Sequence, residues 1–207
     1  SELPVDNRRV FLRVDFNVPM DPDHNITDDA RIMAALPTIK HLLDREARLV
    51  IASHLGRPKG NRMPEYSLEP VGAQLTQLLD TEVIFPEDCV GDGPQKLAAA
   101  PRDGQVMLLE NLRFEPGETR NDDQFAKQLA SLADVYVNDA FGTMHRAHAS
   151  TAGVPRLIPD KGMGLLVEKE LESLGKLMDR PVRPFVTITG GAKVSDKIGV
   201  LTNLLGR

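Results

Sequence analysis

Five short stretches of the chain place charged or amide side chains directly after an apolar run. From the N-terminal end onward they read RVDFNVP, SHLGRP, ENLRF, NDAFGTMHRAHAS and GGAKVSDK. Arginine, lysine and histidine stand out in these stretches, and a guanidinium group grips phosphate or carboxylate oxygens through two parallel hydrogen bonds. The pattern predicts a binding site for a small anion.

The basic residues of these stretches are expected at one edge of a sheet, because ligands of open parallel sheets bind at the carboxyl ends of the strands. Those assigned to the anion site are His54, Arg57, Arg113 and Arg146, joined by Arg31 near the start of the first helix. Facing arginines repel one another in an empty site, so a multiply charged anion is the expected occupant. Each charge-assisted hydrogen bond contributes roughly 1.5–3 kcal/mol.

Asp15 and Asn17 are expected beside the basic residues, and they suit a different part of the ligand. A carboxylate accepts the proton of a hydroxyl group, and an amide bridges to it. A small hydroxy acid that carries a phosphate meets all of these demands.

The elements that must position these side chains follow from the hydrophobic pattern. Short apolar runs that do not alternate are typical of parallel strands covered on both faces, and they lie at Val10–Val14, Leu49–Ala52, Val83–Phe85, Val106–Leu109, Val135–Val137 and Phe185–Ile188. Segments of helical period lie between them, at Ile32–Leu43, Leu68–Leu78, Phe125–Leu132 and Met163–Met178. The alternation predicts a three-layer, Rossmann-like α/β domain with a mostly parallel sheet.

Several local features carry their own expectations. Pro37 should kink or divide the first helix, while Ser67 and Asn121 are expected to cap the helices that follow them. Asn138 and Asp139 are expected to cap the next helix or to brace arginines. The segments GDGPQK and KGMGLL are expected to form turns, since neither completes a nucleotide-binding glycine pattern after a strand.

Together the five stretches resemble the motifs of the phosphoglycerate kinase family, in that family's order and across essentially the whole chain. The resemblance implies the fold of the family's N-terminal domain. It also implies reversible transfer of a phosphoryl group between ATP and the carboxylate of 3-phosphoglycerate, which gives 1,3-bisphosphoglycerate in glycolysis. In this family the N-terminal domain binds the glycerate, the C-terminal domain binds the magnesium nucleotide, and hinge closure brings them together.

The resemblance implies a role for each candidate residue. Asp15 and Asn17 would hold the 2-hydroxyl end of the substrate, and its 3-phosphate would lie among His54, Arg57, Arg113 and Arg146. Arg31 and Lys193 would be the catalytic residues at the transferring phosphoryl group. The phosphates of ATP or ADP would contact Gly190, Gly191, Lys193 and Lys197. Mg²⁺ belongs to the complete enzyme, and its family ligand is expected outside these 207 residues.

The segment DRPVRP suggests a domain boundary. We expect an N-terminal 3-phosphoglycerate-binding domain over 1–160, an interdomain helix over 161–180, and the first strand and helix of a nucleotide-binding domain over 181–207. Such a chain is expected to bind 3-phosphoglycerate without turning over alone. The alternative is a non-catalytic module for phosphorylated hydroxy acids, but such a module has no need of Lys193 and Lys197.

Composition restricts the partners further. The formal net charge of −5 argues against nucleic acid or an anionic membrane as partner. Cys89 is the only cysteine, which favours a reducing, cytoplasmic setting. No apolar run approaches the ~18–20 residues of a membrane span, and the polar N-terminal residues lack the apolar stretch typical of a signal peptide. A pair of histidines, His145 and His148, is not expected to bind metal, since no suitable third ligand lies nearby. The complete enzyme is expected to be a monomer.

Overall fold

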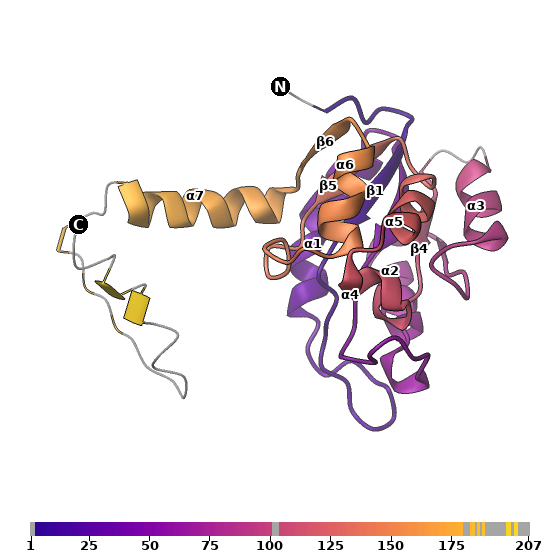
Figure 1. Cartoon of the computed structure of the whole chain (residues 1–207), viewed down its shortest axis with the longest axis horizontal. Coiled ribbons are helices and arrows are strands. Elements are labelled where there is room, and N and C mark those ends of the chain that lie inside the picture. Colours follow the sequence, from indigo (N-terminus) through magenta and orange to yellow (C-terminus); the bar gives the residue numbers. More distant parts are fainter. Residues whose placement is uncertain are drawn as a thin grey trace. The chain divides into compact units, whose positions relative to one another are not determined.

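The computed structural model describes residues 3–100 and 104–179, together with residues 183, 184, 186, 188, 198, 199, 201 and 202. The chain divides into two compact units, Ser1–Glu168 and Lys169–Arg207. The first unit contains the sheet and the helices that cover it (Figure 1). Within the described residues, no helix is long and apolar enough to cross a bilayer.

The first unit is built on one parallel sheet of six strands in the order β3-β4-β2-β1-β5-β6. The strands are β1 Arg9–Arg13, β2 Arg48–Ala52, β3 Val83–Ile84, β4 Val106–Leu108, β5 Val135–Asn138 and β6 Asp160–Met163. The order matters for the site, because β4, β2, β1 and β5 are consecutive neighbours in the sheet. Loops that follow these four strands therefore start side by side.

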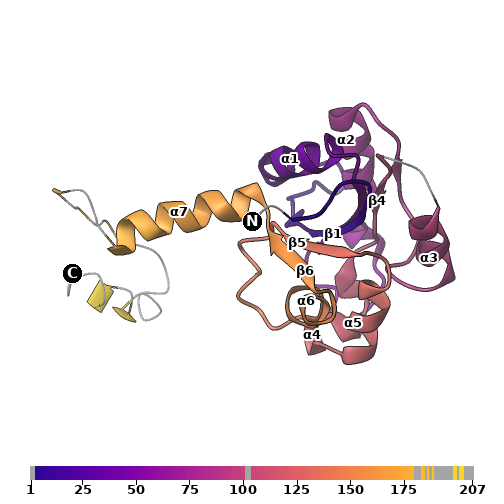
Figure 2. The ribbon, with the colours of Figure 1, turned by 90° about the horizontal axis from the view of Figure 1, so that it is seen from above.

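Helices cover both faces of the sheet (Figure 2). They are α1 Ala30–Leu43, α2 Glu69–Leu79, α3 Asp92–Ala99, α4 Pro116–Arg120, α5 Asp123–Ala130, α6 Val154–Leu157 and α7 Leu165–Asp179, with short 3₁₀ turns η1 Pro64–Tyr66 and η2 Leu112–Phe114 and a π turn η3 Ala149–Gly153. Figure 2 shows α1 and α2 on one face and α4, α5 and α6 on the other. The predicted three-layer α/β fold is confirmed.

The core is split by the sheet into two clusters, as the alternation of side chains along a strand requires. In β1, Val10 and Leu12 pack in the cluster under α1 and α2. Phe11, between them, packs in the opposite cluster with residues of α5, and its ring stacks on Tyr136 with centroids 5.9 Å apart. A continuous apolar run is needed because both faces of the strand are buried.

Three elements differ from the sequence-based expectation. The strand β6 was not predicted, since DKGM lacks an apolar run, and it covers part of KGMGLL, whose last residues begin α7. GDGPQK enters helix α3 rather than a turn. The short helix α4 was also not predicted.

Pro37 does not divide the first helix, because α1 runs unbroken from Ala30 to Leu43. Asn121 was expected to begin α5, but it ends α4 in the left-handed conformation at φ 53°, and the side chain of Asp122 caps α5 instead. Ser67 lies one residue before the N-cap of α2, although its hydroxyl accepts a hydrogen bond from the N–H of Glu69. In both cases the residue expected to cap the helix lies one residue before the observed N-cap.

The strand expected over 185–188 and the helix expected from about Lys193 fall mostly outside the described residues. The domain boundaries at 160 and 180 therefore stay predictions.

Candidate functional site

The seven residues predicted to bind the small anion line one pocket of about 290 Å³. They are Asp15, Asn17, Arg31, His54, Arg57, Arg113 and Arg146, and Gly56, Gly142 and Thr143 complete the lining. Five of them follow β1, β2 and β5, Arg113 lies in η2 after β4, and Arg31 comes from the first turn of α1. The pocket thus lies at the carboxyl ends of four neighbouring strands.

Asp15 and Asn17 form one side of the pocket with fixed side chains. Asp15 Oδ2 accepts a hydrogen bond from Arg31 Nη1 at 2.5 Å. Asn17 Oδ1 accepts the N–H of Gly56 at 2.8 Å. Oδ1 of Asp15 also accepts the N–H of Asn17 at 3.2 Å. These contacts fix the orientation of the Asp15 carboxylate and of the Asn17 amide at the pocket.

Gly56 is where the chain turns into the pocket. Its φ of +59° lies in the left-handed region, and a Cβ there would meet Cε1 of Tyr66 at 2.3 Å. Its carbonyl oxygen accepts a hydrogen bond from Arg113 Nη1 at 2.6 Å. Glycine is required here because both its conformation and the space beside it exclude a side chain.

The arginine wall, formed by Arg57, Arg113 and Arg146, carries uncompensated positive charge. Within the described part of the chain, the guanidinium groups of Arg57 and Arg146 have no protein partner. Burial, followed by the charge of Arg146, lowers the pKa of Arg113 below its usual range. An arginine destabilised by neighbouring arginines is a group that an anion in the pocket would stabilise.

His54 is buried at 3% exposure, and its Nδ1 lies 3.2 Å from Nη2 of Arg13. Burial, assisted by the charges of Arg13 and Arg113, lowers the pKa of His54 from 6.5 to about 2. The histidine is therefore neutral at pH 7, and counting it among the cations of the site was wrong. Its contribution to the pocket is a hydrogen-bonding group without charge.

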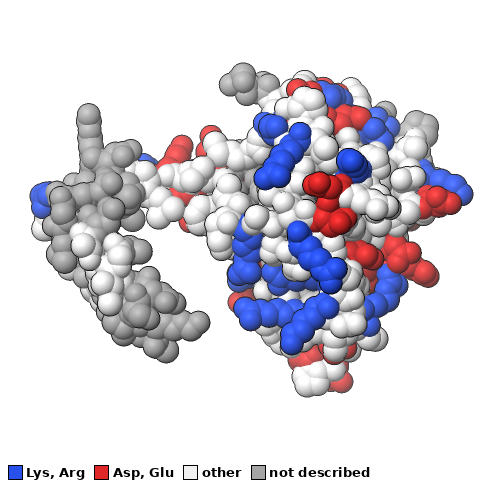
Figure 3. Space-filling model, in the orientation of Figure 1, with Lys and Arg blue, Asp and Glu red and all other residues white. Residues whose placement is uncertain are grey.

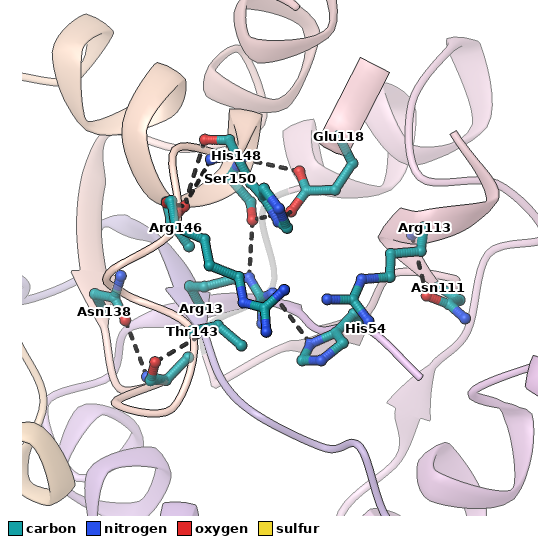
Figure 4. Close-up of polar contacts among 12 residues, drawn as sticks. Arg13, His54, Asn111, Arg113, Glu118, Asn138, Thr143, Arg146, His148 and Ser150 are labelled. Atoms are coloured by element: carbon teal, nitrogen blue, oxygen red, sulfur yellow. Dashed lines mark hydrogen bonds and ion pairs between the residues drawn. The ribbon is translucent and has the colours of Figure 1, made fainter. Parts of the chain in front are cut away.

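Arg13, the last residue of β1, was missed by the sequence-based reasoning. Its side chain is 1% exposed and lies behind the pocket, among Arg113, Arg146 and His54 (Figure 4). Its Nε donates to Ser150 Oγ at 2.8 Å, and Nη1 donates to the carbonyl oxygen of Val14. The only available signal was a charged residue inside the apolar run that precedes Asp15.

Glu118 of α4 supplies the buried negative charge near Arg13. Burial opposes its ionisation, but the nearby imidazole of His148, the charge of Arg13 and the hydrogen bonds of Ser150 lower the pKa of Glu118 below its ordinary value. Oε1 of Glu118 also lies 3.7 Å from Nδ1 of His148. The carboxylate is therefore ionised at neutral pH and is the buried counter-charge to Arg13.

Comparison with known proteins agrees with this arrangement. The family model described as phosphoglycerate kinase matches residues 1–207. The chain belongs to the phosphoglycerate kinase family.

Curated phosphoglycerate kinases resemble the chain closely over its whole length. The protein of Anaeromyxobacter sp. (strain K) is 58% identical over 207 residues, which cover 99% of this chain and 52% of that protein. The protein of Chlorobium phaeovibrioides is 54% identical over 204 residues, covering 99% of this chain and 51% of that one. The chain thus spans about half the length of the curated relatives that it matches.

A solved structure shares the fold. The phosphoglycerate kinase of Coxiella burnetii superposes with a TM-score of 0.87 at 42% identity, over 100% of this chain and 51% of that one.

In this member of the family, the arginine wall also borders a second pocket of about 360 Å³. Lys59, Arg120 and His148 are among the residues that line this second pocket. Basic side chains gather over the region of α4 on the face in Figure 3. The arginine wall can therefore be approached from two sides.

The polar residues at the end of β5, Asn138 and Asp139, brace the structure. Asp139 Oδ1 accepts the N–H groups of Leu166 and Val167 at 3.0 and 3.2 Å, so it caps α7. Asn138 Oδ1 accepts the N–H of Ala140. In the described part of the chain, no group of three or more His, Cys, Asp or Glu residues is arranged to hold a metal.

The predicted nucleotide contacts Gly190, Gly191, Lys193 and Lys197 lie outside the described residues.

Proposed function

We propose that this member of the phosphoglycerate kinase family binds 3-phosphoglycerate in the pocket at the carboxyl ends of β4, β2, β1 and β5. The observation that carries the proposal is the convergence of the seven predicted side chains on that single pocket. A site with four arginines, one ion-paired carboxylate and one amide suits a ligand that has a dianionic phosphate, a hydroxyl group and one carboxylate.

Each part of the substrate has a partner of suitable chemistry. The arginine wall would hold the 3-phosphate, because guanidinium groups bind phosphate oxygens in two-point fashion. His54 would add a neutral donor. Asp15 and Asn17 would hold the 2-hydroxyl group, and Arg31, paired with Asp15, would lie at the reacting carboxylate.

The proposed reaction of the complete protein is reversible phosphoryl transfer between ATP and that carboxylate. A carboxylate is already ionised at pH 7, so this chemistry needs no general base. It needs positioning and positive charge around the transferring group. Arg31 would supply that charge from the side of the glycerate.

The nucleotide side of the proposal concerns Gly190, Gly191, Lys193 and Lys197. These residues would contact the phosphates of ATP or ADP, and Mg²⁺ would neutralise part of the phosphate charge when the complete enzyme is loaded.

We further propose the domain division 1–160, 161–180 and 181–207, a cytoplasmic setting and a monomeric complete enzyme.

Calorimetric titration of the chain with 3-phosphoglycerate and, separately, with MgADP tests the proposal. Saturable heat is expected with 3-phosphoglycerate and little heat with MgADP. Glycerate without phosphate is the matched ligand control, and it should bind much more weakly because the arginine wall loses its anion. Equal binding of glycerate and 3-phosphoglycerate, or no binding of either, would contradict the proposal.

A further inference from the structure

A chain of buried polar side chains lies behind the pocket and connects Glu118 to His54 (Figure 4). We call Glu118, Ser150 and Arg13 the buried relay. Their exposures are 0%, 0% and 1%, and they come from α4, η3 and β1. Burying two charges is unfavourable unless the ions are paired and their hydrogen bonds are satisfied. Three separate elements therefore converge on an arrangement that only good geometry can stabilise.

The direction of every hydrogen bond in the buried relay is fixed by chemistry. A guanidinium group can only donate, so Arg13 Nε donates to Ser150 Oγ at 2.8 Å. The serine hydroxyl has one proton, which it donates to Glu118 Oε1 at 2.6 Å. The other carboxylate oxygen, Oε2, accepts the N–H of Ser150 at 2.9 Å. Glu118 thus orients the Ser150 hydroxyl so that a lone pair of Oγ points toward Arg13.

The other end of Arg13 determines the state of His54. Nη2 of Arg13 must be the donor across the 3.2 Å to Nδ1 of His54, so Nδ1 is an acceptor without a proton. The single proton of the neutral imidazole is then on Nε2. His54 lines the anion pocket, so its polar contribution there is that of an N–H donor.

We propose that Glu118 is a positioning residue for the substrate site: through Ser150 and Arg13 it holds His54 as the Nε2–H tautomer, with that N–H available to the anion. Glu118 touches neither the substrate nor the reacting groups. The inference rests on the proposed function only for the identity of the anion.

The arrangement serves an anion site in a specific way. Arg113 and Arg146 already repel each other, and a charged histidine beside them would add to that repulsion. A neutral Nε2–H donor strengthens binding of a phosphate group without adding charge to the empty site. The inverted tautomer would instead present a lone pair to the phosphate oxygens, which repels them.

The test is a two-bond ¹H–¹⁵N spectrum of the histidines in the full 207-residue chain without ligand. The variants are Glu118→Gln, Ser150→Ala and the control Glu115→Gln, which removes the same charge three residues away. The wild type and the control are expected to show His54 as the Nε2–H tautomer. In the two relay variants the Nδ1–H tautomer should become populated, because Arg13 loses its oriented acceptor.

Binding of 3-phosphoglycerate gives the second readout. The Kd should rise about tenfold in the relay variants, since a donor to a charged phosphate is lost from part of the population. In a His54→Ala background, Glu118→Gln should have no further effect on Kd, because the two residues act in one unit. If Glu118 had only a structural role, Glu118→Gln would still raise the Kd in the His54→Ala background.

The possible results distinguish failure of the inference about Glu118 from failure of the proposed function. Nδ1–H in the wild type overturns the inference even if both relay variants fail to fold. Folded relay variants that keep the Nε2–H tautomer and a Kd within twofold of the wild type overturn it as well. Absence of 3-phosphoglycerate binding to the wild type, with the tautomer as expected, counts against the proposed function alone.

Discussion

Nη2 of Arg13 lies 3.2 Å from Nδ1 of His54, and both side chains are buried. This contact joins the last residue of β1 to the loop after β2, which are neighbouring strands of the sheet. Burial, assisted by the charge of this arginine, lowers the pKa of His54 and keeps the histidine neutral. The positive charge of the anion pocket therefore comes from four arginines, whereas His54 contributes a polar group without charge.

The first prediction is that the free energy of unfolding depends on pH through His54. The pKa of His54 falls from 6.5 to about 2 on folding, mainly through burial. Between these two values the unfolded chain binds more protons than the folded one, so stability is lost as the pH falls below 6.5. From pH 7 to pH 5 this loss should be about 2 kcal/mol, measured by denaturant unfolding at each pH.

His54→Gln should remove this slope, because the amide does not titrate. The matched control is His41→Gln at an exposed position of α1, and it should retain the slope that His54 produces. Equal slopes for the wild type and His54→Gln would show that His54 does not titrate in this way.

The fold was largely predictable because continuous apolar runs mark strands that are buried on both faces. Val10, Phe11 and Leu12 pack in alternate clusters across the sheet, which is the property that the run encodes. The edge strand β6 could not be found this way, because only one neighbour pairs with it and its DKGM residues are not buried.

The site was predictable where a residue faces the pocket and less so behind it. The exposed ends of strands concentrate charged residues in recognisable stretches, and Arg57, Arg113 and Arg146 were found there. Ser150 contacts Arg13, and Glu118 contacts Ser150, so these residues join distant parts of the sequence. No local pattern distinguishes Glu118 from a solvated surface glutamate, and the protonation of His54 depends on these same contacts.

The second prediction concerns the arginine wall. Arg57→Ala should weaken binding of 3-phosphoglycerate by about 2–4 kcal/mol, because charged hydrogen bonds to the phosphate are lost. The thermal stability of the ligand-free chain should not fall, since Arg57 has no protein partner in the described part of the chain. Calorimetry and thermal unfolding of the same sample measure both quantities.

Arg156→Ala is the matched control for Arg57, since Arg156 is exposed and lines neither the anion pocket nor the second pocket. It should change neither binding nor stability. Similar losses of affinity in both variants would indicate a general charge effect instead of a defined contact.

The third prediction concerns Gly56. Gly56→Ala places a Cβ 2.3 Å from Cε1 of Tyr66 at a φ of +59°, and it should destabilise the fold by about 1–3 kcal/mol. It should also weaken 3-phosphoglycerate binding, because the backbone of Gly56 holds both Asn17 and Arg113. Denaturant unfolding and calorimetry measure the two effects.

Gly93→Ala provides the control for the third prediction, since a Cβ at this helical position of α3 has nothing within 4 Å. It should leave binding unchanged and raise stability by up to about 1 kcal/mol, because alanine favours the helix. If Gly56→Ala behaved like Gly93→Ala, the turn at Gly56 would not be constrained as described.

The last prediction separates binding from turnover, in a phosphoglycerate kinase of the relatives' full length that contains this segment. Arg31 Nη1 pairs with Asp15 Oδ2 at 2.5 Å, and the Arg31 side chain remains 50% exposed toward solvent. Under the proposed function Arg31 lies at the reacting carboxylate, where its interaction with the substrate gains strength as charge develops on the group in transfer, so Arg31→Ala should mainly lower kcat. Arg57→Ala, at the unreactive phosphate, should mainly raise KM for 3-phosphoglycerate. Steady-state kinetics of both variants measure the two parameters. If the two substitutions changed kcat and KM equally, Arg31 and Arg57 would not have the separate roles in turnover and binding that are predicted here.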